Sequence, residues 1–451
     1  MDRPPETIPE LLAARVNAAP DRPWLFFEER QWTHAEVSRN VARYAAGLAA
    51  RGVVRGDTVA LVAANRPETI FSWFAANHLG AKMLVLNPAL KTPEQDAMFA
   101  AANARVVLRS AEEAAGLPSD AAPPPVAALP DDVAVLLATS GTTGAPKLIP
   151  QTHRVLALTA ESVPAWLGLT SDDRLMTALP LFHINAQAYS TLGSLGGGAS
   201  LVLLPKFSAS RFFEDAKRTG ATVFNAVGAM INILLASEPR ASDRDHRLRL
   251  CYSALALPEA QHRAFEERFG VRMIVGYGMS ETTFGTIWPL DAPPRYGAMG
   301  VLRQHPRLGV VNEAKLGDDG ELFLKNPATK GEWLATGDIV KRDPEGWFTF
   351  VSRKKDVIRR RGENVAAGEV EAVLLQHPSV LEAAVVAAPS KLGEDEIVAY
   401  VAPKPNAAID VESITAFCKE RLADFKVPSV VHVRESLPKT PTERVAKHLL
   451  E

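Results

Sequence analysis

The stretch LLATSGTTGAPKLIPQTH, residues 136–153, decides how the rest of the chain is interpreted. An apolar, strand-like run ends at Leu137, and a loop rich in glycine and hydroxyl residues follows. Glycines let backbone N–H groups approach an anion closely, so we expect the loop to hold phosphate. It lacks the G-x-x-x-x-G-K-[ST] pattern of a P-loop, and a polar surface turn is the alternative. The candidate ligands are Thr139, Ser140, Gly141, Thr142, Thr143, Gly144 and Lys147.

Composition indicates a globular protein with more than one domain. The chain has 451 residues, of which 47% are hydrophobic and 23% charged. The formal net charge is −2 and no basic stripe stands out, which argues against a nucleic-acid partner. Neither a signal peptide nor an apolar run long enough for a bilayer is visible, so we expect no membrane association and a cytoplasmic location. Cys251 and Cys418 fit a reducing compartment as buried free thiols.

The first two-thirds of the chain alternate strand and helix patterns, interrupted by a Pro/Ala-rich loop at 121–130. Short β-branched runs between helices predict an α/β fold with parallel sheets, whose ligands lie at the carboxyl ends of the strands. We expect strands at 57–65, 82–88, 199–205, 222–227, 248–255 and 271–278, and helices at 34–51, 67–80, 210–220 and 258–270.

A change of pattern after about residue 352 predicts a second, smaller domain. Residues 379–404 are typical of two strands joined by a polar turn, 411–425 of a helix and 429–435 of a strand. This is a small α+β unit, and we place the domains at 1–352 and 353–451.

Three further stretches carry polar groups suited to a nucleotide. In RMIVGYGMSETT (272–283), Tyr277 can stack on a base and Glu281 can bind Mg²⁺, although a turn with a capped helix start explains the same residues. Asp338, in WLATGD, can accept hydrogen bonds from a ribose, although TGD alone is most often a turn. The basic run at 352–365 taken alone is a solvated charged turn.

Together these stretches resemble one family. TSGTTGAPK, LPLFH (179–183), GYGMSETT, WLATGD and SRKKDVIRRRGENVAAGEVE occur in an order that is similar to that of the adenylate-forming superfamily of acyl- and aryl-CoA synthetases, adenylation domains and luciferases. Bacterial acyl-CoA ligases of the crotonobetaine/carnitine-CoA ligase type are most similar. The resemblance implies a large N-terminal domain of parallel β/α subdomains plus a small β-barrel, and a small mobile α+β C-terminal domain.

The resemblance also implies a two-step reaction. A carboxylate attacks the α-phosphate of MgATP to give an acyl-AMP and pyrophosphate, and the thiol of CoA then displaces AMP. Such work is mostly positioning and the neutralisation of developing charge. Adenine would stack on Tyr277 beside Gly278, the ribose would bind Asp338 and Arg353, and Ser280 would lie near the α-phosphate. The implied acyl pocket is lined by His183, Asn185, Phe224, Met230, Gly276, Gly278 and Phe284, and Lys355 is the implied hinge.

The chain departs from the family pattern in four places. The C-terminal motif P-x-T-x-x-G-K reads PKTPTER, so Arg444 stands where the family has its catalytic lysine, and Lys439 or Lys447 is an alternative replacement. The segment 317–338 is short, SALALP (253–258) brings bulk near the expected pocket, and the thiolation loop, GENVAAGEVE, lacks a proline.

Three functions therefore remain open from the sequence. The first is an acyl- or aryl-CoA ligase acting on a small carboxylic acid, for which the apolar pocket residues favour an aryl or medium apolar acid. The second is an adenylating enzyme with another acceptor, such as a carrier protein or an amine. The third is a non-catalytic nucleotide-binding protein, which the intact ATP motifs disfavour. A monomer or a homodimer is expected.

Overall fold

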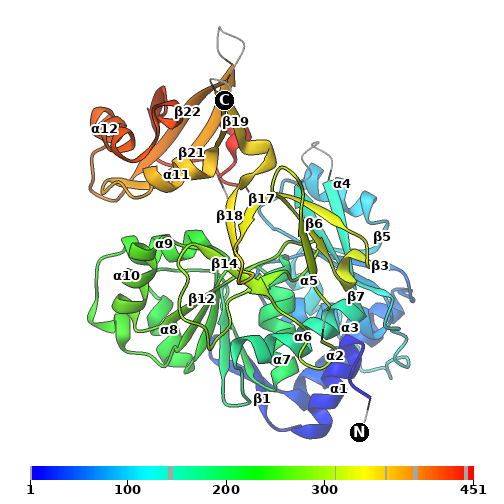
Figure 1. Cartoon of the computed structure of the whole chain (residues 1–451). Coiled ribbons are helices and arrows are strands. Elements are labelled where there is room, and N and C mark those ends of the chain that lie inside the picture. The colour runs from blue at the N-terminus through cyan, green and yellow to red at the C-terminus, as the bar shows by residue number, and fades with distance from the viewer. Residues whose placement is uncertain are drawn as a thin grey trace.

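The computed structural model describes residues 3–140, 146–309, 311–360, 363–389, 395–440 and 445–450. Two β/α units and a run of antiparallel strands form the large N-terminal part. A small α+β unit, coloured orange and red, lies above them in Figure 1. The expected α/β class is confirmed.

The first β/α unit contains the β6–β7 hairpin that carries the quoted stretch. Its five-stranded sheet has the order β5-β3-β4-β6-β7, in which only β7 is antiparallel to its neighbour. All five residues of β3 are buried, as expected for a parallel strand covered on both faces. The strands are β3 (Thr58–Val62), β4 (Lys82–Leu86), β5 (Ala104–Leu108), β6 (Val133–Ser140) and β7 (Pro146–Thr152), and the helices are α2 (His34–Ala50), α3 (Pro67–His78), α4 (Thr92–Ala101) and α5 (Ala111–Ala115).

The second β/α unit is the mainly parallel half of a thirteen-stranded sheet, in the order β12-β11-β10-β8-β9-β1-β2, in which only the edge strand β2 is antiparallel to its neighbour. Its strands are β1 (Pro23–Phe27), β2 (Arg30–Thr33), β8 (Arg174–Thr177), β9 (Ser200–Leu203), β10 (Val223–Ala226), β11 (Leu250–Ser253) and β12 (Arg272–Tyr277). The helices around it are α1 (Ile8–Ala18), α6 (His153–Leu167), α7 (Gly193–Gly197), α8 (Phe212–Thr219), α9 (Gly228–Ala236) and α10 (Glu259–Phe269), with the π-helix η1 (Asn185–Leu192) and the 3-10 turn η2 (Ala241–Arg244).

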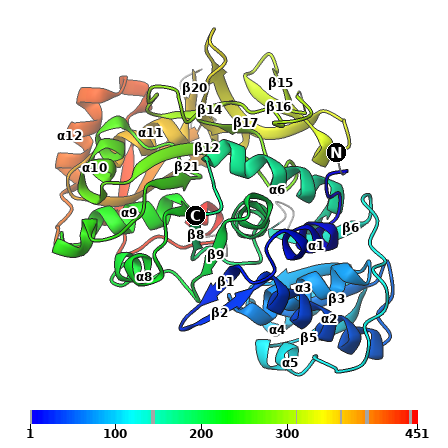
Figure 2. The same cartoon turned by 90° about the horizontal axis from the view of Figure 1, so that it is seen from below.

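Figure 2 shows α1 beside α6 and close to the blue first unit. α1 contacts α2, α3, α6 and α7, so the N-terminal helix joins the two β/α units. A capping box made by Thr7 and Glu10 starts this helix. The two β/α units, which carry most of the expected motifs, are thereby packed against each other through α1.

The antiparallel half of the same sheet continues from β12 in the order β13-β14-β18-β17-β16-β15. This is the region expected as a small barrel, and its hydrogen bonding is continuous with that of the parallel half. The elements are β13 (Thr286–Ile287), β14 (Ala298–Leu302), β15 (Glu313–Leu316), β16 (Glu321–Lys325), η3 (Pro327–Thr329), β17 (Leu334–Arg342) and β18 (Phe348–Arg353).

The C-terminal unit has a hydrophobic core of its own, built around residues between Ile358 and Val427. The predicted boundary after residue 352 falls one residue before the end of β18, and it stays a prediction. The expected helix 411–425 ends earlier, at Arg421. The elements are η4 (Lys354–Asp356), β19 (Val357–Arg360), β20 (Glu363–Ala366), α11 (Ala367–Leu374), β21 (Val380–Pro389), β22 (Asp395–Pro403), α12 (Val411–Arg421), η5 (Asp424–Lys426), β23 (Val430–Val433) and η6 (Lys447–Leu449).

Within the described ranges, every helix is too short or too polar to cross a lipid bilayer.

Candidate active site

The β6–β7 hairpin positions the predicted phosphate loop. The strand expected to end at Leu137 continues to Ser140, because Thr139 pairs with Lys147 and Ser140 with Pro146 across the hairpin. β-Branched residues such as Thr139 fit such a paired strand. The Lys147 side chain is 62% exposed at the start of β7. The side chains of Thr139 and Ser140, and the predicted ligands Gly141, Thr142, Thr143 and Gly144, lie outside the described residues.

The loop that follows β12 lies against this hairpin. Glu281, whose side chain is 22% exposed, places Oε1 3.7 Å from Nζ of Lys147. Two glycines flank the point where β12 ends and the loop begins, and the space for a side chain is smaller at Gly276 than at Gly278. A Cβ on Gly276 would come within 2.4 Å of the Tyr252 ring, and one on Gly278 would lie 3.2 Å from the carbonyl oxygen of Thr283. The structure therefore brings together two motifs that are about 130 residues apart in the sequence.

Gln151, on β7, makes a second link between the hairpin and this loop. Its Nε2 donates to the carbonyl oxygen of Ser280 at 2.7 Å, and its Oε1 accepts from Oγ1 of Thr283 at 2.9 Å. Sequence reasoning missed this residue. The available signal was an amide within the strand-forming run LIPQT, which becomes informative only when the strand is known to be buried.

Tyr277, Asp338 and Arg353 converge as the nucleotide motifs predict. The Tyr277 hydroxyl donates to Oδ2 of Asp338 at 2.5 Å, and Nη1 of Arg353 lies 2.8 Å from Oδ1. The carboxylate is 1% exposed. Burial first, and then the Asp338 charge, raises the pKa of the Tyr277 phenol, so Tyr277 stays a hydrogen-bond donor at neutral pH. β12, β17 and β18 each supply one member, which fixes their geometry.

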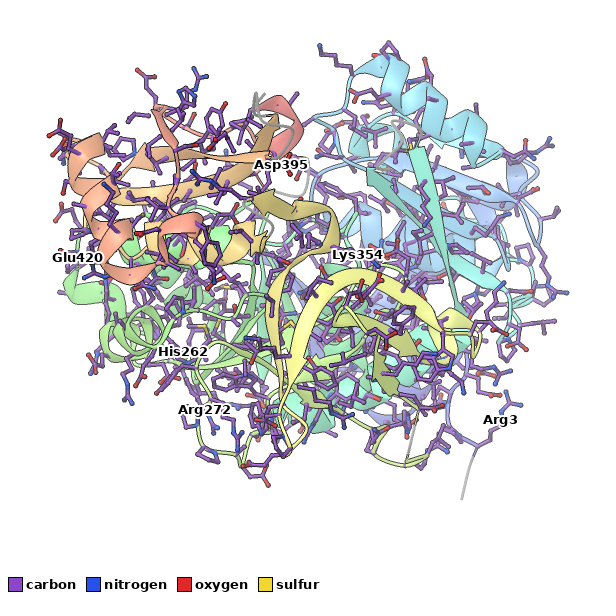
Figure 3. The ribbon with its side chains drawn as sticks, turned by 45° about the horizontal axis from the view of Figure 1, so that its top comes forward. Arg3, His262, Arg272, Lys354, Asp395 and Glu420 are labelled. Carbon is purple, nitrogen blue, oxygen red and sulfur yellow. The ribbon has the colours of Figure 1, made fainter. Side chains whose placement is uncertain are left out.

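The segment next to the predicted hinge is fixed by lysine–carboxylate pairs. Lys354, which Figure 3 labels near the yellow strands, pairs with Glu321 at 2.6 Å and with Asp319 at 2.8 Å. These carboxylates, Asp319 first, raise the pKa of the Lys354 ammonium. The predicted hinge residue Lys355 belongs to η4, but its side chain lies outside the described residues. Sequence reasoning did not single out Lys354.

On the expected acyl side, a hydrogen-bonded amide pair joins η1 to β10. Nδ2 of Asn225 donates to Oδ1 of Asn185 at 2.9 Å and to Oγ of Ser190 at 3.0 Å. Asn225 is fully buried, and its Oδ1 has no hydrogen-bond partner in the described part of the chain. His183 is half-buried in the turn just before η1, with its ring 4.5 Å from that of Phe182. Asn225 was not among the predicted pocket residues.

The remaining predicted pocket residues are buried, and one of them, Phe224, faces away from Asn185. The ring of Phe224 packs against Phe212 of α8 at 5.0 Å, on the opposite face of β10 from Asn225. Met230 is buried in α9, and Phe284 packs edge-on against Trp166 at 5.9 Å. Phe224 therefore faces α8, while Asn225 faces η1, which carries Asn185.

The lysines that could replace the family's catalytic lysine are both paired within the small unit. Lys439 pairs with Glu382, and Lys447 lies 2.7 Å from Glu371 and 3.2 Å from Asp356. Arg444 lies outside the described residues.

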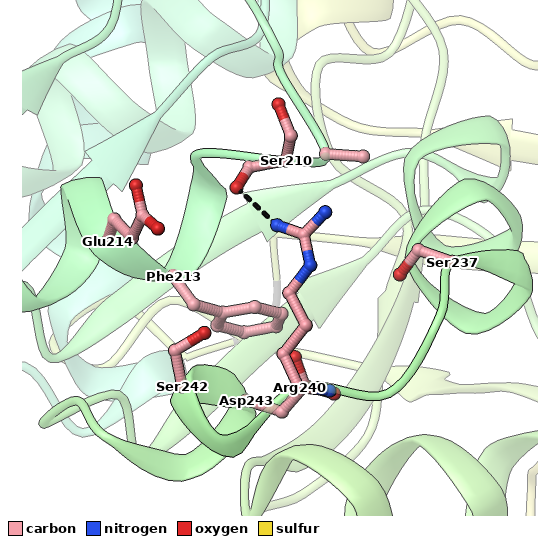
Figure 4. A pocket seen from close by; sticks show the side chains of 8 residues that line it. Ser210, Phe213, Glu214, Ser237, Arg240, Ser242 and Asp243 are labelled. Atoms are coloured by element: carbon pink, nitrogen blue, oxygen red, sulfur yellow. Dashed lines mark hydrogen bonds between the residues drawn. The ribbon is translucent and has the colours of Figure 1, made fainter.

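A shallow pocket elsewhere has a different character. Figure 4 shows it between α8, η2 and the segment after α9, where Arg240 donates to the carbonyl oxygen of Ser210 at 2.7 Å. None of the predicted site residues lines it. It is therefore separate from the candidate active site.

The chain belongs to the AMP-binding enzyme family. The family's large domain matches residues 12–333, and the AMP-binding enzyme C-terminal domain matches residues 369–444. The chain is therefore an adenylate-forming enzyme of the acyl- and aryl-CoA ligase superfamily, as the motif order predicts.

A curated relative, crotonobetaine/carnitine–CoA ligase of Shigella flexneri, is 31% identical over an alignment of 492 positions that covers 93% of both chains. Because that alignment is longer than this chain, the relative carries insertions that this chain lacks.

Two solved structures are similar throughout. Anthranilate CoA ligase AuaEII in complex with anthranoyl-AMP has a TM-score of 0.89 at 26% identity, covering 98% of this chain and 96% of the other. O-succinylbenzoate CoA synthetase from Bacillus subtilis, in complex with ATP and magnesium, has a TM-score of 0.84 at 28% identity and covers 98% of both chains.

Proposed function

We propose that this enzyme activates a small carboxylic acid with MgATP through an acyl-AMP intermediate and passes the acyl group to CoA. One observation carries the proposal: the hairpin of the phosphate motif and the loop of the Glu281 motif meet, with Lys147 and Glu281 3.7 Å apart. At this distance, Lys147 can bind the phosphate oxygens of a magnesium–triphosphate complex while Glu281 binds its Mg²⁺ ion.

The chemistry of Glu281 fits a magnesium site of this kind. Within the described ranges, no group of three or more His, Cys, Asp or Glu side chains could hold a metal ion. Mg²⁺ beside a nucleotide usually keeps several waters and takes one or two carboxylates together with phosphate oxygens. A single accessible carboxylate beside Lys147 meets that need. Bound there, the ion would neutralise phosphate charge as pyrophosphate leaves.

We place the nucleoside at the triad formed by Tyr277, Asp338 and Arg353. Tyr277 offers its ring to adenine beside Gly278, and Asp338 with Arg353 offers acceptors and donors to the ribose. Both carboxylate oxygens of Asp338 already have partners, so ribose hydroxyls would bind its remaining lone pairs or displace the Tyr277 hydroxyl. The phosphates would bind Thr139, Ser140, Gly141, Thr142, Thr143, Gly144 and Lys147.

Transfer would take place between these two ends. We assign Ser280 and His183 to the region of the α-phosphate and the acid carboxylate, and Arg444 to the position of the bridging cation. We further propose that the small domain turns about Lys355 between the two half-reactions, as closure steps of this kind often govern turnover.

The acid would lie beside Asn185. The predicted lining is His183, Asn185, Phe224, Met230, Gly276, Gly278 and Phe284, and we leave out Phe224 because it packs against Phe212 on the other face of β10. Asn225, next to Asn185, adds a buried acceptor that has no donor among the described residues. Such an acceptor favours an acid that carries a hydrogen-bond donor. We therefore extend the expected aryl or medium apolar acid to one with an amino or hydroxyl substituent.

Acid-dependent ATP–pyrophosphate exchange tests the proposal. A panel of aliphatic and aryl acids, with and without amino or hydroxyl groups, should reveal at least one acid that supports exchange. AMP release should then rise when CoA is added. The absence of exchange with every acid would contradict activation, whereas exchange without a CoA effect would favour a carrier protein or an amine as the acceptor.

The location of the enzyme also remains a proposal. Cys251 and Cys418 are buried free thiols, as expected in a reducing compartment such as the cytoplasm.

A further inference from the structure

Gln151 is a buried amide that reaches from the phosphate hairpin to the catalytic loop. It follows Lys147 by four residues on β7, so both side chains leave the same face of the strand. It is 1% exposed. Its donor and its acceptor are used at once, on Ser280 and on Thr283. Gln151 thus holds two points of the 279–285 loop from one strand.

The loop needs such support because its backbone is strained. Thr283 has a φ of +59°, in the left-handed region, where a β-branched residue is a clear outlier. It is 2% exposed, and its hydroxyl donates to Gln151. Strain of this kind persists only when surrounding contacts over-determine the conformation, and it is concentrated at functional sites.

A second amide holds the other end of the loop. Nδ2 of Asn326, in the segment between β16 and η3, donates to the carbonyl oxygens of Thr282 and Phe284 at 3.1 Å each. These contacts hold residues 282–284. Among the hydrogen bonds of the described residues, the contact that reaches Ser280 comes from Gln151. Gln151 therefore sets the position of the Ser280–Glu281 corner relative to Lys147.

We propose that Gln151 is a positioning residue for adenylation. It fixes the Ser280–Glu281 corner at the distance from Lys147 at which a magnesium–triphosphate complex is held. The proposal rests on the proposed function. A leucine at this position would keep the volume of the side chain and leave the Ser280 carbonyl and the Thr283 hydroxyl buried without partners, so that the loop would shift.

Three variants test this role by ATP–pyrophosphate exchange and thermal unfolding. Gln151→Leu should lower kcat about 10²-fold, the scale of a 1 Å misplacement of catalytic groups, and should raise the KM for MgATP. Thr283→Val, which keeps the shape but removes one hydrogen bond, should lower kcat about tenfold, while Thr283→Ser should restore it because the hydroxyl returns. The Mg²⁺ concentration needed for half-maximal exchange should rise in the first two variants only.

Asn77→Leu is the matched control. Asn77 is also a fully buried amide, and its Nδ2 donates to the carbonyl oxygens of Ala81 and Ala134 at 3.0 and 2.8 Å, within the first β/α unit. It should lower the melting temperature as Gln151→Leu does, while kcat, the KM for MgATP and the Mg²⁺ requirement stay unchanged.

A Gln151→Leu protein that loses thermal stability but keeps wild-type exchange kinetics overturns the proposal. If Gln151→Leu does not fold, Thr283→Val decides, and equal kinetics of Thr283→Val and Thr283→Ser overturn it. If the wild-type chain shows no exchange with any acid, the proposed function fails instead. Gln151 is then judged by calorimetric MgATP binding, where an unchanged dissociation constant in Gln151→Leu overturns its role.

Discussion

Two carboxylate–cation pairs lie at opposite ends of the candidate site, and they are built differently. Asp338 is 1% exposed and lies 2.8 Å from Arg353, with the Tyr277 hydroxyl on its other oxygen. Glu281 is 22% exposed and lies 3.7 Å from Lys147, whose side chain is 62% exposed. In the first pair a short contact joins a buried carboxylate to a partly exposed guanidinium, and in the second, the open pair, a longer contact joins a partly exposed carboxylate to an exposed ammonium.

This difference indicates which end of the nucleotide site is already formed. A buried carboxylate needs partners at all times, so Asp338 and Arg353 also stabilise the fold. An exposed pair contributes little to stability because water screens it. We therefore expect the proposed nucleoside end to be rigid before ligand binds, and the proposed phosphate end to exchange its mutual contact for contacts with Mg²⁺ and phosphate.

Asp338→Ala should have the largest effect, because it acts on both binding and folding. We expect kcat/KM for MgATP to fall about 10³-fold, the equivalent of about 4 kcal/mol, as for truncation of one partner of a buried charge pair. The free energy of unfolding should fall by about 2 kcal/mol, since Tyr277 and Arg353 lose their acceptor. Exchange kinetics and urea unfolding measure the two effects.

Asp319→Ala is the control for that variant, because Asp319 is a half-exposed carboxylate paired with Lys354 near the same strands. It should leave both quantities close to wild type. Equal losses in the two variants would show that the buried pair has no special part in nucleotide binding.

The second comparison is between Arg444 and Lys447, the two candidates for the cation that would bridge the acid carboxylate and the α-phosphate. Lys447 is held by Glu371 and Asp356, so Lys447→Ala should lower the free energy of unfolding by about 2 kcal/mol and leave exchange nearly intact. Arg444→Ala should instead reduce exchange about 10²-fold, as expected for removal of one charge-stabilising donor. Equal or reversed effects on exchange would remove Arg444 from the bridging role, and a reversed effect would assign that role to Lys447.

Much of the framework could be predicted from the sequence because parallel strands carry strong apolar runs. The strand expected at 57–65 is β3 (Thr58–Val62), and the helix expected at 67–80 is α3 (Pro67–His78), whose first residue is a proline. The family resemblance also implied that Tyr277, Asp338 and Arg353 serve one nucleotide, and these three side chains lie in contact in the structure. Ends of elements were less certain, since a run such as 411–425 gives no clear stop at Arg421.

The contacts that shape the site could not be predicted in the same way. Gln151 and Ser280 are 129 residues apart, and no local pattern links them. In β10 all four residues are buried, so alternation cannot show that Phe224 faces α8 while Asn225 faces Asn185. Side-chain direction in such strands is decided by tertiary packing.

Glu281→Gln tests the open pair directly. The amide keeps the shape of the side chain but is a poor magnesium ligand, so the Mg²⁺ concentration for half-maximal exchange should rise at least about tenfold, since even outer-shell partners contribute 10- to 100-fold. The free energy of unfolding should change by less than about 1 kcal/mol. A metal dependence equal to that of the wild type would remove Glu281 from the magnesium role.

The smallest expected effect concerns the pH dependence of stability, and it tests whether the strand that carries Lys147 of the open pair is rigidly packed at its end. His153 follows β7 directly and starts α6; it is fully buried, and its Nδ1 accepts from the backbone N–H of Ile8 at 3.3 Å. Burial lowers the pKa of His153 to about 4. Because the unfolded chain binds this proton near pH 6.5, stability from the neutral imidazole is complete above that pH and declines as the pH falls towards 4.

Between pH 7 and 5.5 this histidine should therefore remove about 1 kcal/mol from the free energy of unfolding. His153→Asn, which keeps an acceptor for Ile8 but cannot be protonated, should flatten that part of the profile in urea unfolding at several pH values. His432→Asn, at an exposed position in β23, should leave the profile unchanged. If the free energy of unfolding of His153→Asn falls with pH as steeply as that of the wild type, protonation of His153 is not the cause of the loss. The end of β7, the strand that carries Lys147, would then not be a rigid, charge-excluding base for the open pair.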